Sequence, residues 1–182
     1  LTVPVSSAGK FGDLCINNIS IATNQAKWNR KHWQALAQSY SKTKYFNEHR
    51  EYFEGVYSQT WEYLNPLLKE LTRYLINQLG IKTEVLYSSD MGIQGKKDEL
   101  VLNICKELSA AKYISGPFGR DYLNPSSFSS AGIELLYHDY KHPIYTQNYS
   151  GFESGMTVLD LLFNQGDNSL ETLESKDSLS KV

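Results

Sequence analysis

The stretch "AKYISGPFGRDYLNPSSFSSAGIELLYHDYK", residues 111–141, decides the fold class. It opens with a short apolar run, 111–115, and closes with a second, 133–141, and both are typical of strands. Between them lie a Gly/Pro loop and a segment headed by Asn124, which predicts a short helical turn with a side-chain cap. Strand, helix and strand in this order predict a parallel pair of strands.

The same alternation extends toward the amino terminus. Leucines recur at helical spacing in "LNPLLKELTRYLINQLG", residues 64–80, with Asn65 and Pro66 as the expected helix start and Gly80 as its end. The sequence therefore predicts an α/β fold, Rossmann-like, with a largely parallel or mixed sheet flanked by helices. Further strands are expected at 1–5, 14–21 and 81–87, and further helices at 25–43, 45–59, 98–110 and 158–166.

The length of 182 residues fits one domain. We expect a single α/β domain over residues 1–166 and a polar carboxyl-terminal tail over 167–182. The chain opens on a strand pattern at Leu1 without a methionine. This predicts a chain that is incomplete at its amino terminus and lacks one or more strands there.

Composition narrows the class of protein. Apolar residues make up 41% of the chain and charged residues 21%, and the net charge of −2 gives no reason to expect nucleic-acid binding. No apolar run approaches the roughly 20 residues that a spanning helix needs, so we expect no membrane insertion. Cys15 and Cys105 share no motif, which fits a reducing cytosol and a cytoplasmic protein, although a single disulfide stays open.

Polar residues gather where three expected strands end. In open parallel sheets, ligands bind outside the carboxyl ends of the strands, so these clusters predict a shared rim. The clusters are Ser88-Ser89-Asp90, Gly116-Pro117-Phe118-Gly119-Arg120-Asp121 and His138-Asp139-Tyr140-Lys141-His142.

The Gly/Pro loop offers groups that suit an anion. Gly116 and Gly119 would let backbone amides approach a ligand, and Arg120 presents a planar fork that matches phosphate or carboxylate. A structural loop is the alternative, with Arg120 paired to Asp121 or another carboxylate. The pattern is weak, because no P-loop motif occurs.

The two histidines at the last cluster suit proton transfer better than metal binding. His138 and His142 lie on a strand and its exit, and neither HExxH nor CxxC occurs. Either histidine can act as a general acid or base near neutral pH, and an ordinary loop histidine is the alternative. Ser89 would be a nucleophile only with a histidine close by, and no GxSxG elbow is present.

Outside the rim, Trp28 and Arg30 fall off the apolar stripe of the helix at 25–43 and are candidates for ligand contact. Cation–π packing of Arg30 on an aromatic ring is the alternative. No metal or cofactor is specified by a motif. The candidate catalytic residues are His142, His138, Asp121 and Ser89, and the candidate substrate-binding residues are Ser115, Gly116, Gly119, Arg120, Tyr122, Ser88, Trp28 and Arg30.

Six segments in series carry a resemblance to a known family. They are "LTVPV", "KWNRKHWQALAQSYSKTKYF", "YSSDM", "YISGPFGRDYL", "FSSAGIELLYHDYKHPIYTQ" and "VLDLLFNQG", which run from residue 1 to residue 166. In order and spacing, the chain resembles the WbqC-like family of bacterial proteins. The resemblance implies that Arg120, Asp121 and Tyr122 are more than turn residues.

The resemblance also sets expectations about function. Family members normally begin with a strand, a Gln-Pro-x-Tyr-x-Pro-Trp segment and an Asn-Arg motif that precede the segment resembling "LTVPV". Neither motif stands before "LTVPV" in this sequence, which supports the expectation of an incomplete chain. The family is associated with polysaccharide and O-antigen gene clusters. This implies a transferase acting on a small anionic or activated substrate, such as a nucleotide-linked sugar or an acyl or aminoacyl group. The alternative is a non-catalytic binding or scaffold protein of the same pathway, and a carrier protein or a second copy of the chain stays open as partner.

Overall fold

The computed structural model describes residues 1–6, 15–22, 27–175 and 179–181. The chain divides into two compact units. Unit 1 comprises Leu1–Lys82 and Ile144–Thr172, and unit 2 comprises Thr83–Pro143 and Leu173–Val182.

Three helices of unit 1 confirm the periodic segments of the sequence. They are α1 (Trp28–Tyr40), α2 (Phe46–Ser58) and α3 (Leu64–Gln78). The expected start of α3 at Asn65 is wrong, because the helix already begins at Leu64. The backbone N–H of Leu64 donates to the Ile19 carbonyl at 2.9 Å, so pairing with a distant segment sets the start of this helix. Gly80 follows the helix with a φ of 70°, as expected of a terminating glycine.

The core of unit 1 is largely aromatic. Helix α7 (Val158–Gln165) contributes Phe163, which is fully buried. Its ring centroid lies 5.3 Å from that of Phe46 and 5.8 Å from that of Phe53, both edge-on, and 5.1 Å from that of Tyr40. Edge-to-face contacts at these distances add to the free energy gained by burial. The spacing of aromatic residues along α1, α2 and α7 therefore builds one shared core.

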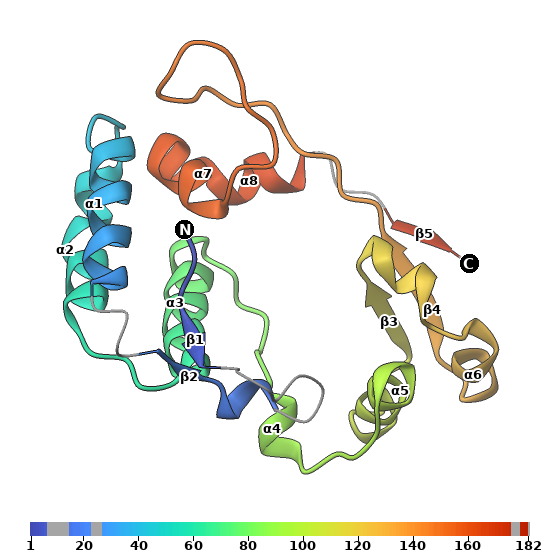
Figure 1. Ribbon diagram of the computed structural model, residues 1–182. Helices are drawn as coiled ribbons and strands as arrows, with labels where there is room; N and C mark the ends of the chain where they lie inside the picture. Colours follow the sequence, from blue (N-terminus) through green and yellow to red (C-terminus); the bar gives the residue numbers. More distant parts are fainter. Residues whose placement is uncertain (7–14, 23–26, 176–178, 182) are drawn as a thin grey trace. The chain divides into compact units, whose positions relative to one another are not determined.

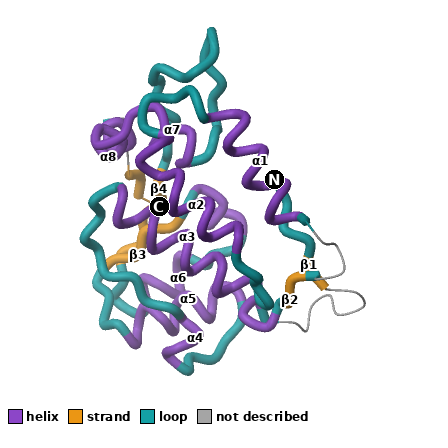
Figure 2. The backbone as a smooth tube through the Cα atoms, turned by 90° about the vertical axis from the view of Figure 1, so that its left-hand side faces the viewer, coloured by secondary structure: helices purple, strands orange, loops and turns teal. Residues whose placement is uncertain are grey.

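Strands occupy little of unit 1, as the orange segments of Figure 2 show. Strand β1 (Val5–Ser6) pairs antiparallel with β2 (Ser20–Ile21), and a 3-10 turn, η1 (Ile16–Asn18), precedes β2. The two strands expected at 1–5 and 14–21 are thus only two residues long in the described chain, while residues 7–14 lie outside the description.

Unit 2 contains the strand pair that the opening stretch predicted. Strands β3 (Lys112–Ser115) and β4 (Glu134–His138) are parallel, with Ser115 opposite Tyr137. Their arrowheads point the same way in Figure 1. The crossover contains a 3-10 helix, η2 (Pro117–Asp121), and α6 (Pro125–Ser130), and β5 (Leu179–Lys181) pairs antiparallel with β4. The mixed α/β class is confirmed, and a Rossmann-like sheet stays a prediction.

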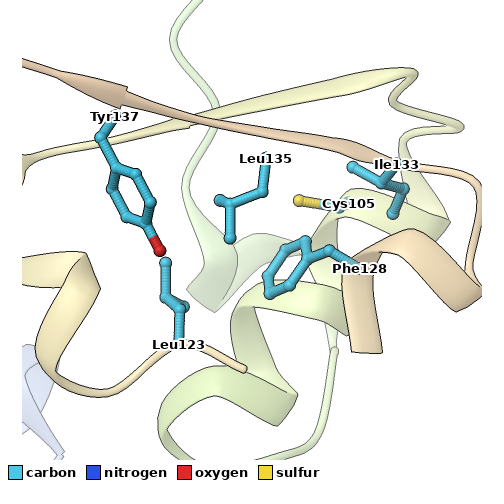
Figure 3. Packing of buried hydrophobic residues seen from close by; sticks show 6 residues of the cluster. All are labelled: Cys105, Leu123, Phe128, Ile133, Leu135 and Tyr137. Carbon is cyan, nitrogen blue, oxygen red and sulfur yellow. The ribbon is translucent and has the colours of Figure 1, made fainter. Parts of the chain in front are cut away.

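A small apolar core holds the helices of unit 2 against this sheet (Figure 3). Phe128 of α6 is fully buried, and its ring stacks on that of Tyr113 with centroids 5.7 Å apart. Cys105 of α5 (Lys97–Glu107) joins the same cluster as a free thiol, and Cys15 is likewise free. Asn124 caps α6 by accepting a hydrogen bond from the Ser126 N–H at 3.1 Å, as the sequence predicted.

The strand expected at 81–87 is wrong, because these residues have no strand partner. Val85 and Leu86 are 44% and 50% exposed, so the apolar pattern is not buried against a sheet. The segment leads into α4 (Ser88–Met91). The region expected to be a polar tail contains η3 (Gly166–Asn168), α8 (Ser169–Glu174) and β5.

Candidate functional site

The carboxyl end of the β3–β4 pair gathers most of the candidate residues of unit 2. Ser115 and Tyr137 lie opposite one another in the parallel register. The segments that follow them, η2 and residues 138–143, therefore leave the sheet at the same edge. We call this part of unit 2 the strand-end site.

Arg120 is the central cation of the strand-end site. Its Nη2 lies 3.0 Å from Asp139 Oδ1 and 3.3 Å from Asp139 Oδ2, and its guanidinium lies 4.3 Å from the centroid of the Tyr137 ring. The carboxylate and the ring orient the guanidinium plane from one side. About two-fifths of the side-chain surface of both Arg120 and Asp139 is exposed, so a ligand can reach the pair.

Gly119 is required by close packing beneath Arg120. A Cβ at this position would lie 2.0 Å from Ser115 Oγ and 2.9 Å from Leu123 Cδ1. Ser115 itself is 4% exposed, and its hydroxyl donates to the Gly116 carbonyl at 3.1 Å. Ser115 thus shapes the turn from within, whereas a Cβ at Gly116 would meet nothing within 4 Å.

A ladder of rings follows β4. The centroids of His138 and Tyr140 are 6.0 Å apart, and those of Tyr140 and His142 are 5.9 Å apart. His142 Nδ1 lies 2.9 Å from the Pro143 carbonyl oxygen. A carbonyl can only accept a hydrogen bond, so Nδ1 carries the proton in this geometry and Nε2 is the nitrogen that would exchange one with a substrate.

Asp121 and Tyr122 complete η2 and its exit. Asp121 is exposed, and Tyr122 is 48% exposed. Phe118, on the same short helix, is 79% exposed. Arg120 pairs with Asp139, a carboxylate outside the loop, as the structural alternative for this loop allowed.

Ser88 and Ser89 lie on α4, and the Ser89 hydroxyl donates to Asp90 Oδ1 at 2.9 Å. Within the described chain, no hydrogen bond or ring contact joins either serine to Arg120 or to the histidines. The structure therefore brings together the second and third clusters of the sequence. Ser88 and Ser89 of the first cluster follow a segment that does not form the expected strand.

Trp28 and Arg30 belong to unit 1. The Trp28 indole lies edge-on to His32, with centroids 5.1 Å apart, and to Tyr57, at 6.3 Å, so it packs in the helical core in part. It also borders a cavity of about 630 Å³ together with Lys31, His32 and the first residues of the chain. The Arg30 side chain is exposed.

Asp160 and His49 are among the buried polar residues of unit 1 that the sequence analysis did not identify. Asp160 is 5% exposed on α7, and His49 is 4% exposed on α2. Burial lowers the pKa of His49, whose Nδ1 lies 2.8 Å from Tyr74 Oη. An acidic residue inside the apolar run "VLDLLFNQG" was the available indication for Asp160.

The described residues contain no group of three or more His, Cys, Asp or Glu side chains placed to ligate one ion.

None of the helices in the described ranges combines the length and the apolar composition needed to cross a bilayer.

Sequence comparison identifies the family. The WbqC-like protein family matches residues 1–172 of the chain. The chain belongs to this family. The chain is also similar to uncharacterized protein Rv1507c of Mycobacterium tuberculosis, with 32% identity over 168 residues, which cover 91% of this chain and 71% of that protein. No solved structure matches this WbqC-like chain.

Proposed function

We propose that this WbqC-like protein is a transferase that binds the anionic part of a small activated substrate at the strand-end site. The observation that carries the proposal is the placement of Arg120, Asp139 and His142 at the carboxyl end of a parallel strand pair. Ligands of open α/β sheets bind at such ends, and an oriented guanidinium is the side chain that best matches phosphate or carboxylate.

The proposed roles follow from this placement. Arg120 holds the anionic group of a nucleotide-linked sugar or an acyl or aminoacyl donor, while Asp139 and Tyr137 keep its guanidinium oriented. His142 or His138 moves the proton of the acceptor. Gly116 leaves the approach to the turn open, since a Cβ at this position would meet no atom beyond its chain neighbours within 4 Å. Tyr122 and Asp121, both exposed, are available to contact the acceptor.

The family supports the setting of the reaction. WbqC-like proteins are associated with polysaccharide and O-antigen gene clusters, so we propose that the reaction belongs to bacterial surface-polysaccharide biosynthesis in the cytoplasm. The roles proposed for Ser88, Ser89, Trp28 and Arg30 are secondary, because their described contacts do not connect them with Arg120.

The experiment is a thermal-shift screen with UDP-glucose, acetyl-CoA and inorganic diphosphate. A ligand that binds the native state stabilises it by mass action, by about 2.7 kcal/mol at a hundred times its dissociation constant. We expect Arg120→Ala to abolish the shift with little change in the melting temperature of the free protein, since exposed ion pairs contribute about 0–1 kcal/mol. A turnover assay of any ligand that binds then tests transfer.

Asp139→Asn is the matched control. It removes the partner of Arg120 but retains the guanidinium, so the shift should persist. Equal loss of the shift in both variants would mean that the pair is structural and would contradict anion binding by Arg120.

A non-catalytic binding protein is the second candidate. It is favoured by the exposure of apolar side chains around the same turn: Phe118 is 79% exposed, Ile114 52% and Tyr140 43%. Such side chains fit a macromolecular partner, such as a carrier protein or a second copy of the chain. Sedimentation of wild type and Phe118→Ala tests the second copy, and the absence of any ligand shift in the screen would favour this reading over the transferase.

A further inference from the structure

Unit 1 contains a pocket between α1 and the loop that leads into α7. Figure 1 shows this loop as a long segment without helix or strand. Its volume is about 470 Å³, in the range of small-molecule sites. Ser39 and Tyr40 of α1 form one side, residues 147–153 form the other, and Asp160 lies among the lining residues.

Asp160 is held by neutral donors. Its Oδ2 accepts hydrogen bonds from Tyr145 Oη at 2.8 Å and from Gln147 Nε2 at 2.9 Å. Burial, followed by the charge of Asp160, raises the pKa of Tyr40 to about 12. Burial and the hydrogen bond to Asp160 raise the pKa of Tyr145. Both tyrosines therefore keep their protons near neutral pH, and Tyr145 donates its proton to the carboxylate of Asp160.

The position of Asp160 in α7 stabilises its carboxylate. It is the third residue of α7, whose amino terminus is capped by Thr157. A negative charge in the first turn of a helix is stabilised by the helix dipole. The helix dipole explains why the Asp160 carboxylate tolerates burial. The dipole does not explain why a pocket with aromatic walls lies beside this carboxylate.

A second acid stands at the same pocket. Gln147 links the two, because its Nε2 donates to the Glu153 carbonyl at 2.9 Å and its Oε1 accepts from the Glu153 N–H at 2.8 Å. The Glu153 side chain is exposed. Among the lining residues, all of which are described, there are two carboxylates and no Lys, Arg or His. The field in the pocket is negative, so a phosphate would be repelled and a cation attracted.

Aromatic rings supply the remaining walls. Phe152 packs edge-on against Tyr145 with centroids 5.5 Å apart. Tyr149 is 68% exposed, and Tyr40 lines the opposite side. The negative faces of such rings attract a desolvated ammonium group, and their apolar area covers the body of a small ligand.

We propose that this pocket binds a small molecule through a protonated primary amino group, which lies near Asp160 and Glu153 while its carbon skeleton packs on Tyr149 and Phe152. All of these residues belong to unit 1, so the binding of an amine here is independent of the anion site proposed for unit 2.

The test compares glucosamine with glucose by saturation-transfer NMR and calorimetry on the full chain. The two sugars differ at one position, an amine in place of a hydroxyl. We expect glucosamine to bind about tenfold more tightly than glucose, as one additional charge-assisted contact allows. Glu153→Gln should weaken the binding of glucosamine alone, and Tyr149→Ala should weaken that of both sugars. Asp167→Asn, which removes an exposed acid of η3 outside the pocket, should leave both unchanged.

Asp160→Asn is expected to abolish the preference for glucosamine. If this variant fails to fold, Glu153→Gln and Tyr149→Ala still decide the matter, because both side chains are exposed. Equal affinity for the two sugars, no binding of glucosamine, or the same loss in Asp167→Asn as in Glu153→Gln would each overturn the proposal.

Discussion

The two units place their polar groups in opposite ways. In unit 1, His32, His49 and Asp160 are buried, and each is hydrogen-bonded. In unit 2, Arg120 and Asp139 stand at the exposed end of a sheet, above an apolar core that contains neither of them. Where polar groups are buried, the stability of the fold depends both on their ionisation and on the packing around them. Where they form an exposed cluster, their side chains can be substituted without disrupting the core. In unit 2, the polar side chains of the strand-end site can therefore be replaced by alanine to test function without loss of the fold. In unit 1, substitutions of the buried polar groups should keep the size and shape of the side chain.

The largest effect should come from emptying either core. Phe163→Ala in unit 1 and Phe128→Ala in unit 2 each remove a fully buried ring, at an expected cost of about 3–5 kcal/mol. All three tryptophans, Trp28, Trp33 and Trp61, lie in unit 1, so their fluorescence reports that unit. In urea, Phe163→Ala should lower the midpoint of the unfolding transition that tryptophan fluorescence follows. Phe128→Ala should instead increase the rate of amide hydrogen exchange in β3 and β4.

The exposed Phe118→Ala serves as the control and should change neither measurement by more than about 0.5 kcal/mol. If Phe128→Ala moves the tryptophan midpoint as far as Phe163→Ala does, the two units unfold as one, and the contrast between them does not extend to stability.

A smaller effect is expected at the turn of the strand-end site. Gly119→Ala places a methyl group 2.0 Å from Ser115 Oγ, so the turn must shift, at a cost of about 1–3 kcal/mol. Gly116→Ala, three residues earlier, meets nothing within 4 Å and should be close to neutral. The comparison is made by thermal unfolding followed by circular dichroism. Ser115→Gly should partly rescue Gly119→Ala, and equal behaviour of the two alanine variants would refute the close packing.

The smallest effect concerns pH and is expected from two buried histidines of unit 1. Burial lowers the pKa of His49 from the model-compound value of 6.5, and it lowers that of His32 as well. As the pH falls below about 6.5, the unfolded chain binds protons that the folded chain does not. Stability is therefore complete above this pH and declines below it, by at most about 1.4 kcal/mol per pH unit for each histidine.

His49→Gln tests this dependence through tryptophan fluorescence in urea between pH 5 and 8 (values chosen about the unperturbed histidine pKa). We expect a less steep decline of stability toward acid in the variant than in the wild type. An unchanged slope would show that His49 takes up its proton in the folded state as readily as in the unfolded state.

Particular elements show how far the sequence could be interpreted. The helix at 64–80 and the cap at Asn124 were predictable, because leucine periodicity and a side chain that accepts from the first helical turn are local properties. The strand at 81–87 was not, because a strand forms only where another strand accepts its hydrogen bonds. One of the three clusters of the expected rim had been assigned to the end of that strand.

The chain by itself determined the parallel β3–β4 pair and the turn between its strands. Glycine and proline residues, apolar runs and helix caps act over a few residues, and here the two runs lie close enough along the chain to pair with each other. The pairing of Arg120 with Asp139 and the burial of Asp160 beside Tyr145 could not be inferred from local sequence. Both outcomes depend on which distant segments meet. Ion-pair and burial energies fall off over a few ångströms in space, whatever the separation along the chain.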